Sequence, residues 1–167
     1  LWKQVDLAAE HLGVAPEPYS GDGSDLDEGQ KLLWRKTHQT IRKVTGDIED
    51  SWQFNTAIAA VMELSNEVTE RWHIEDDGVA PRAAVASDSP SGSTGTSWSV
   101  LRLALESMVR LLGPMVPHIT EELWERLGHE GGLMTAGWPG YDEEACREDE
   151  VELGAECDLD KDEAYCL

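Results

Sequence analysis

Five of the 13 lysine and arginine residues gather in one short stretch of the sequence: Lys31, Arg35, Lys36, Arg42 and Lys43. Arg35 and Arg42 are seven positions apart, and so are Lys36 and Lys43, so in a helix each pair shares one face. Guanidinium and ammonium groups donate hydrogen bonds to phosphate oxygens, and a stripe of them is consistent with phosphate binding. The alternative is a solvated helix face whose cations pair with neighbouring Asp and Glu.

The charge balance of the whole chain argues in the opposite direction. Asp and Glu total 34 against 13 Lys and Arg, which gives a formal net charge of −21 over 167 residues. Such an excess normally argues against a nucleic-acid partner, because phosphate binding requires cations that displace counterions. Either the partner is not a nucleic acid, or the protein is adapted to high salt, where repulsion between distant charges is screened. The low lysine count favours salt adaptation; a plain acidic surface is the third interpretation.

Other residues capable of chemistry have simpler structural explanations. His118 follows a proline at a predicted helix start, and Glu121 and Glu122 fall in the first turn, where carboxylates suit the helix dipole. The chain has three cysteines, Cys146, Cys157 and Cys166. Their odd number does not indicate a disulfide framework, and they lack zinc-ligand spacing to His129. No glycine-rich phosphate loop occurs. We therefore expect no catalytic, cofactor-binding or metal-binding residues in this chain.

The elements that must position these residues are predicted to be helices. Apolar residues recur at helical spacing in five segments, and Gly113-Pro114 and Pro117 end one helix and begin the next. Since each apolar stripe needs a partner, the sequence predicts an all-α bundle of four or five helices. The predicted segments are 1–12, 30–50, 55–72, 97–112 and 117–127.

The predicted buried positions follow from the same periodicity. In the second helix they are Leu33, Thr37, Ile41, Val44 and Ile48, and the third helix is expected to begin at an Asn55 N-cap. The third helix should bury Ile58, Val61, Met62, Ser65 and Val68, and the last should bury Ile119, Leu123, Trp124 and Leu127. Trp34, His38 and Trp52 are expected to pack rather than to bind a ligand. Arg102 and Arg110 are weaker candidates for phosphate contact.

The remaining segments lack periodicity. Residues 13–29 are rich in turn-forming residues and predict a loop. Residues 75–97 are dominated by small and polar residues and predict a flexible connector. Residues 138–167 are acidic and predict an irregular tail. There is no run of about 18 apolar residues and no basic-then-apolar leader, so neither a membrane span nor secretion is expected.

Two segments resemble a known family. The segment PMVPHITEELWERL (114–127) closely resembles the hairpin in the anticodon-binding domain of class I aminoacyl-tRNA synthetases of the leucine, isoleucine and valine group. Within that group, THQTIRKVTGDIEDSWQFNTAIAAVMELSNEV (37–68) is similar to the leucyl-tRNA synthetase family. The likeness covers most of residues 1–153. Val116 stands where Thr is frequent in the family, and the match fails after Glu152.

The resemblance implies an organisation and a function. Residues 1–12 would end a helix from the catalytic body, 13–137 would form the tRNA-docking domain, and 138–167 would lead towards a missing C-terminal domain. It implies a non-catalytic fragment that binds tRNA(Leu) and its parent chain. The parent would be a cytoplasmic, monomeric ligase that uses ATP and Mg²⁺. Lys31, Arg35, Lys36, Arg42 and Lys43 would contact the tRNA backbone. The alternative is a stand-alone acidic helical module that binds proteins.

Overall fold

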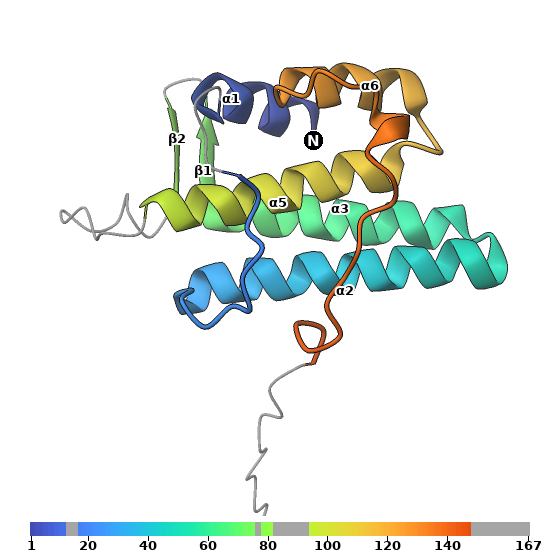
Figure 1. The fold of residues 1–167 in the computed structure, drawn as a ribbon, viewed down its shortest axis with the longest axis horizontal. Helices are drawn as coiled ribbons and strands as arrows, with labels where there is room; N and C mark the ends of the chain where they lie inside the picture. Colours follow the sequence, from blue (N-terminus) through green and yellow to red (C-terminus); the bar gives the residue numbers. More distant parts are fainter. Residues whose placement is uncertain (13–16, 76–77, 82–93, 148–167) are drawn as a thin grey trace, which may run out of the picture.

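The molecule is a helical bundle in two layers. The computed structural model describes residues 1–12, 17–75, 78–81 and 94–147. Three long helices, α2, α3 and α5, pack together, and two shorter ones, α1 and α6, lie side by side across one side of them (Figure 1). The expected all-α bundle is therefore confirmed, with a small hairpin added. The helices are α1 (Trp2–Leu12), α2 (Glu28–Ser51), α3 (Phe54–Arg71), α5 (Thr94–Leu112) and α6 (Pro117–Arg126), with a 3₁₀ turn η1 (Leu133–Thr135).

Helix α2 begins and ends with well-defined caps. The Asp27 side chain accepts a hydrogen bond from the Gln30 backbone N–H, and the Gln30 side chain accepts one from the Asp27 backbone N–H, which forms a capping box. The helix ends at Ser51, and the cap residue Trp52 adopts the left-handed conformation (φ 51°, ψ 38°). The expected N-cap of α3 at Asn55 is wrong: Gln53 occupies that position and makes no capping bond through its side chain.

The core lies between α2, α3 and α5. The predicted stripe of α2 is confirmed, because Leu33, Thr37, Ile41 and Val44 are buried and Ile48 is partly buried against the core. The predicted stripe of α3 is wrong in part, because Ile58 and Met62 are 38% and 61% exposed. The buried residues of α3 are Ala57, Ala60, Val61, Leu64 and Val68.

The rotation of α3 has a physical reason. Alanines at 57 and 60 let α3 approach its neighbours closely, so the small side chains face inward and the larger ones face solvent. Periodicity alone could not decide this, because both faces of 54–62 are uncharged. In α6, Ile119 is likewise 52% exposed rather than buried, and Thr120 takes the inner place beside Leu123 and Trp124.

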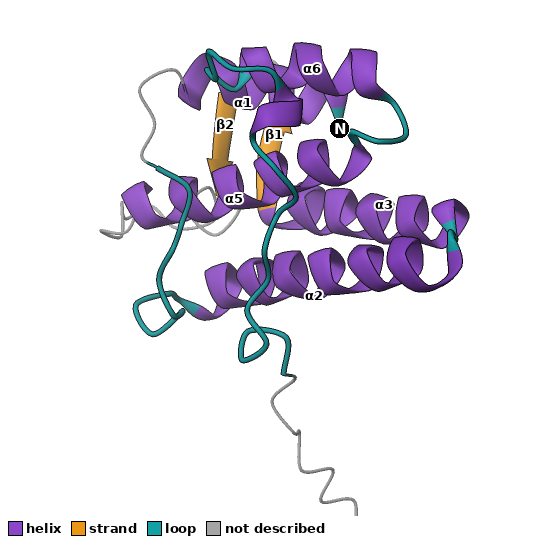
Figure 2. Cartoon of the chain, turned by 45° about the vertical axis from the view of Figure 1, so that its right-hand side comes forward, coloured by secondary structure: helices purple, strands orange, loops and turns teal. Residues whose placement is uncertain are grey.

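Two strands follow α3 where a connector without regular structure was expected. β1 (Trp72–Glu75) pairs antiparallel with β2 (Gly78–Pro81), with His73 opposite Ala80 and Ile74 opposite Val79 (Figure 2). The prediction for 75–97 is therefore wrong at 75, which ends β1, at 78–81, and at 94–97, where α5 already begins. Burial of Trp72 and Val79 anchors the hairpin, and the Trp72 ring packs 4.9 Å from that of Trp98. Residues 76–77 and 82–93 of this prediction lie outside the described residues.

An extended segment crosses both layers after η1. Residues 136–147 run from α6 past α5 to α2 without helix or strand, as expected for an irregular segment, but they are packed rather than loose (Figures 1 and 2). The Trp138 indole N–H donates to Thr45 Oγ1 at 2.9 Å, and the Asp142 backbone N–H donates to His38 Nδ1 at 3.1 Å. Ala145 and Cys146 are buried. Residues 148–167 of the predicted tail lie outside the described residues.

None of the helices in the described part of the chain combines the length and the apolar character that crossing a bilayer requires.

Candidate phosphate-binding face of α2

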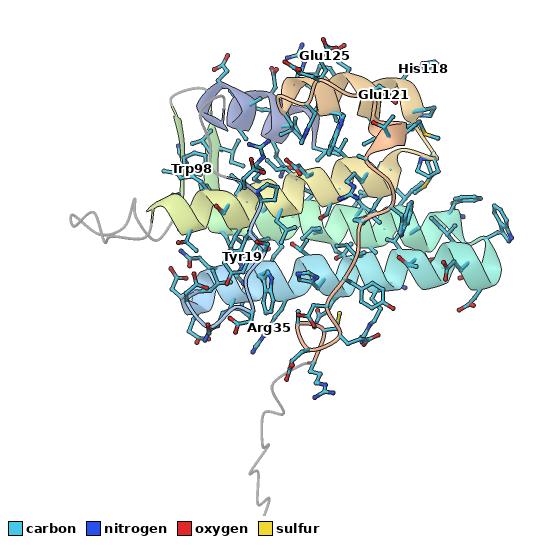
Figure 3. All side chains as sticks on the ribbon, in the orientation of Figure 1. Tyr19, Arg35, Trp98, His118, Glu121 and Glu125 are labelled. Atoms are coloured by element: carbon cyan, nitrogen blue, oxygen red, sulfur yellow. The ribbon has the colours of Figure 1, made fainter. Side chains whose placement is uncertain are left out.

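All five predicted cations lie on α2, and none occupies the core. The side chains of Arg42 and Lys43 are 48% and 53% exposed, and those of Lys31 and Lys36 are about a third exposed. Arg35 points away from the bundle (Figure 3). The predicted helix and the outward direction of these residues are confirmed, whereas a phosphate-binding role for them stays a prediction.

Carboxylates accompany the cations. Lys31 lies 3.7 Å from Glu28 and Lys43 lies 3.3 Å from Asp47, both on α2 itself. Lys36 Nζ reaches Glu63 of α3 at 3.0 Å, and Arg42 reaches Glu143 of the 136–147 segment at 3.6 Å. This is the pairing that the alternative interpretation of the stripe anticipated. Because these pairs are exposed, each contributes only about 0–1 kcal/mol, so a competing anion can displace the carboxylate.

Three of the cations surround one open hollow. Lys36, Arg42 and Lys43 line a space of about 470 Å³ between α2, α3 and the 136–147 segment. Its remaining lining residues are Gln39, Thr40, Ala60, Glu63 and Cys146. Such a mixture of cations, an amide and a hydroxyl suits phosphate oxygens and ribose hydroxyls, and it holds no activated nucleophile or acid–base pair. In chemical terms the hollow can bind and orient an anionic backbone.

Sequence reasoning missed part of this hollow. Gln39 and Thr40 lie within one turn of Lys36 and Lys43, so their spacing could have placed them on the same surface. Nothing local in the sequence indicated that Glu63, Glu143 and Cys146 would come to the same place from α3 and from the 136–147 segment.

A ring cluster on α2 includes His38, which accepts a hydrogen bond from the 136–147 segment. Trp34 is buried and packs edge-on against His38, with 5.2 Å between ring centroids, and Tyr19 packs edge-on against Trp34 at 6.4 Å. Burial lowers the pKa of His38, and the nearby Asp142 carboxylate partly opposes this effect. Neutral His38 can accept the Asp142 N–H at Nδ1. The expected packing roles of Trp34 and His38 are confirmed.

Arg102 and Arg110, the weaker candidates on α5, make contacts within the fold. Arg102 is largely buried and pairs with Glu106 at 2.7 Å, and His129 Nε2 lies 2.9 Å from the same carboxylate. Arg110 donates to the backbone carbonyls of Ala136 and Gly137, where the crossing segment begins. Burial lowers the pKa of Arg110 while Glu106 opposes this effect. These arginines position the end of α6 and the segment after it.

The residues around the α6 start are likewise structural. Glu121 accepts the Leu133 backbone N–H at 2.8 Å, and Glu122 pairs with Arg126 at 3.2 Å. Trp124 is buried and stacks on His129 at 3.6 Å. The expected core role of Trp124 is confirmed, whereas that of Trp52 is wrong, because its side chain is 73% exposed.

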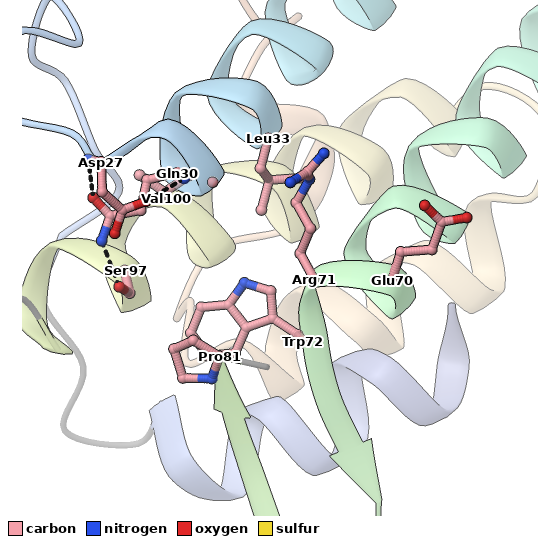
Figure 4. A pocket seen from close by; sticks show the side chains of 10 residues that line it. Asp27, Gln30, Leu33, Glu70, Arg71, Trp72, Pro81, Ser97 and Val100 are labelled. Atoms are coloured by element: carbon pink, nitrogen blue, oxygen red, sulfur yellow. Dashed lines mark hydrogen bonds between the residues drawn. The ribbon is translucent and has the colours of Figure 1, made fainter. Parts of the chain in front are cut away.

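A second pocket, of about 240 Å³, lies where α2, α5 and the hairpin meet (Figure 4). Trp72, Leu33 and Val100 supply apolar walls. Several of its polar groups are engaged in the fold: Gln30 completes the cap of α2 and donates to Ser97 Oγ at 2.6 Å, and Arg71 pairs with Glu67. This pocket offers no cluster of reactive groups.

The bundle, with its hairpin of α5 and α6 and a cation-bearing α2, matches a family model described as the anticodon-binding domain of tRNA ligase over residues 30–162. The chain belongs to this family of anticodon-binding domains. Its relatives include leucine–tRNA ligases. It is 43% identical over 145 residues to that of Geobacter sp. (strain M21), covering 87% of this chain and 15% of the relative.

Two further comparisons agree. The leucine–tRNA ligase of Chromohalobacter salexigens is 42% identical over 156 residues, covering 93% of this chain and 16% of that relative. The crystal structure of the ternary complex of Agrobacterium radiobacter K84 agnB2 LeuRS with tRNA and LeuAMS superposes with a TM-score of 0.65 at 26% identity, covering 87% of this chain and 16% of that chain. The expected family is therefore confirmed. The chain spans about 15% of the length of the relatives it matches.

Proposed function

We propose that this chain is the tRNA-docking domain of a leucine–tRNA ligase, and that the cation-bearing face of α2 holds the sugar–phosphate backbone of tRNA(Leu). The hollow lined by Lys36, Arg42 and Lys43 is the observation that carries the assignment of this face. The family match and the names of the relatives support the substrate. In this proposal the five predicted residues, Lys31, Arg35, Lys36, Arg42 and Lys43, position the tRNA without reading its bases.

Exchange of ion-pair partners is the physical basis of the contact. An exposed pair such as Arg42–Glu143 is weak in water, whereas a phosphate offers a planar guanidinium two acceptor oxygens at once. Each phosphate bound also releases counterions from the RNA, which favours association at low salt. The carboxylates near the cations therefore lower the affinity of the α2 face for RNA but do not prevent binding.

The net charge of −21 sets the conditions under which this works. Long-range repulsion between the acidic domain and RNA is screened at high salt, within about 3 Å at 1 M, while short-range contacts persist. We infer that the source of this protein is salt-adapted. The parent ligase acts as a cytoplasmic monomer, and the ATP and Mg²⁺ needed for aminoacylation bind outside residues 1–167.

A second candidate is the stand-alone acidic module that binds proteins. The pairing of Lys31, Lys36, Arg42 and Lys43 with carboxylates is the observation that favours it. Under this candidate the α2 face has no RNA ligand, so charge changes there leave tRNA affinity unaltered.

Matched charge variants of the full-length ligase that carries this domain test the proposal by tRNA(Leu) binding across salt concentrations. Arg42→Gln should weaken binding and reduce the slope of log affinity against log salt by about 1, whereas Lys3→Gln, an equal charge change on α1, should leave the slope unchanged.

Removing a carboxylate should change tRNA affinity in the opposite direction. Glu143→Gln should strengthen binding because it removes the competitor of Arg42, and Glu144→Gln, its exposed neighbour, should have little effect. Equal slopes for Arg42→Gln and Lys3→Gln would refute the assignment of the α2 face.

A further inference from the structure

An exposed apolar stripe runs from the α2–α3 turn along the outer side of α3. Trp52 and Phe54 are 73% and 39% exposed, and their rings meet edge-on with centroids 6.1 Å apart. Ile58 and Met62 follow Phe54 at intervals of four residues, so the three share one face of the helix. We call Trp52, Phe54, Ile58 and Met62 the tip stripe. The turn that begins it lies at the end of the bundle remote from the β1–β2 hairpin (Figure 1).

The backbone at Trp52 makes this side chain unusual. Among the described residues, Trp52 alone combines a positive φ with a side chain, and the other positive-φ residues are glycines. Glycine is the usual residue in this left-handed position after a helix. The indole does not fill the core, because it is mostly exposed, and the backbone there would be easier for glycine. Its placement therefore presents a large aromatic surface to solvent.

Charge around the tip stripe indicates what can bind there. Glu49 and Asp50 are exposed in the last turn of α2, and the negative end of the helix dipole lies at the same point. Residues 51–62 carry no charged side chain, although 28% of the chain is charged. An indole face beside carboxylates and a helix C-terminus attracts a cation and repels phosphate. An apolar ligand with a positive group fits this surface, and an RNA backbone does not.

We propose that the tip stripe is a docking surface for a basic amphipathic protein segment. An arginine or lysine of that segment lies over the Trp52 indole, next to Glu49 and Asp50, and its aliphatic side chains lie along Phe54, Ile58 and Met62. Trp52 is nine residues beyond Lys43, which corresponds to about 13 Å along a helix. The surface is thus separate from the α2 hollow and does not depend on the RNA-binding proposal.

Calorimetric titration of the full-length ligase that carries this domain tests this inference. The probe is a synthetic amphipathic helical peptide of leucine and arginine, compared with a peptide in which glutamate replaces arginine and with a single-stranded RNA oligonucleotide. We expect the arginine peptide to bind, the glutamate peptide not to bind, and any RNA binding on the α2 face to be unchanged by Trp52→Ala. Trp52→Ala and Met62→Ser should each weaken it about tenfold, and Met134→Ala, which changes another exposed methionine, should not.

Several results would overturn the proposal. These are equal affinity of the wild-type chain and Trp52→Ala for the arginine peptide, equal binding of the glutamate peptide, or RNA binding that Trp52→Ala abolishes. Trp52→Gly serves as the second variant: glycine suits the backbone there, so this variant should keep its fold and should weaken binding of the arginine peptide as Trp52→Ala does. Helix content measured by circular dichroism shows that each variant is folded.

Discussion

Alanine usually stabilises a helix more than glycine does, but at position 52 the glycine variant should be more stable than the alanine variant. Alanine keeps the Cβ atom that makes the left-handed conformation costly, by about 1–2 kcal/mol, and glycine removes it. Glycine in turn loses about 0.5–1 kcal/mol through the greater freedom of the unfolded chain. The difference leaves Trp52→Gly more stable than Trp52→Ala by about 0.5–1 kcal/mol.

Both variants lose the part of the indole that is covered. Trp52 is 73% exposed, so about a quarter of a side chain that buries 150–250 Å² when enclosed is lost, or about 1–1.5 kcal/mol at 25 cal/mol per Å². Trp52→Ala should therefore be destabilised by about this amount, and Trp52→Gly should lie close to the wild type.

Urea unfolding followed by circular dichroism measures these differences. The control position is Asn66, exposed within α3, where alanine should be more stable than glycine by about 1 kcal/mol. If alanine equals or exceeds glycine in stability at position 52 as well, the left-handed backbone at Trp52 does not exist in solution and the reasoning fails.

Two further predictions concern His38 and the face of α3. Because burial lowers the pKa of His38, the folded chain binds its proton less tightly than the unfolded chain, so stability should be full above the ordinary value of 6.5 and fall as the pH drops below it. Urea midpoints compared with those of His38→Gln, which keeps an acceptor but cannot titrate, should show this loss in the wild type only. Leu64→Ala should cost about 2–5 kcal/mol and Met62→Ala less than about 1 kcal/mol in the same assay, and equal costs would contradict the observed orientation of α3.

The helices could be predicted from sequence because their signals are local. The stripe of Leu33, Ile41 and Val44 fixes both the existence and the inner face of α2, and Pro114 and Pro117 mark the turn between α5 and α6. In α3 the inner face could not be chosen, since alanine at 57 and isoleucine at 58 are both acceptable to the pattern, and only packing against α2 and α5 decides between them.

The remaining features depend on residues distant in sequence. The β1–β2 hairpin depends on the contact between Trp72 and Trp98, and the crossing segment depends on hydrogen bonds to His38, Thr45 and Arg110 along its path. The candidate site shows the same division. The five cations were found by spacing on one helix, whereas Glu63 and Glu143, which modulate them, arrive from elsewhere in the fold.

The pairing of α1 with α6 has a consequence for how the chain folds during synthesis. Arg126 binds Asp6 across 120 positions of sequence and also lies over the Trp2 ring. At about 5–20 residues per second, a ribosome needs roughly 6–24 s to produce the partner of the first helix. The α2–α3 hairpin can close within a small fraction of that time, so α1 waits for α6 with one side uncovered and open to a chaperone.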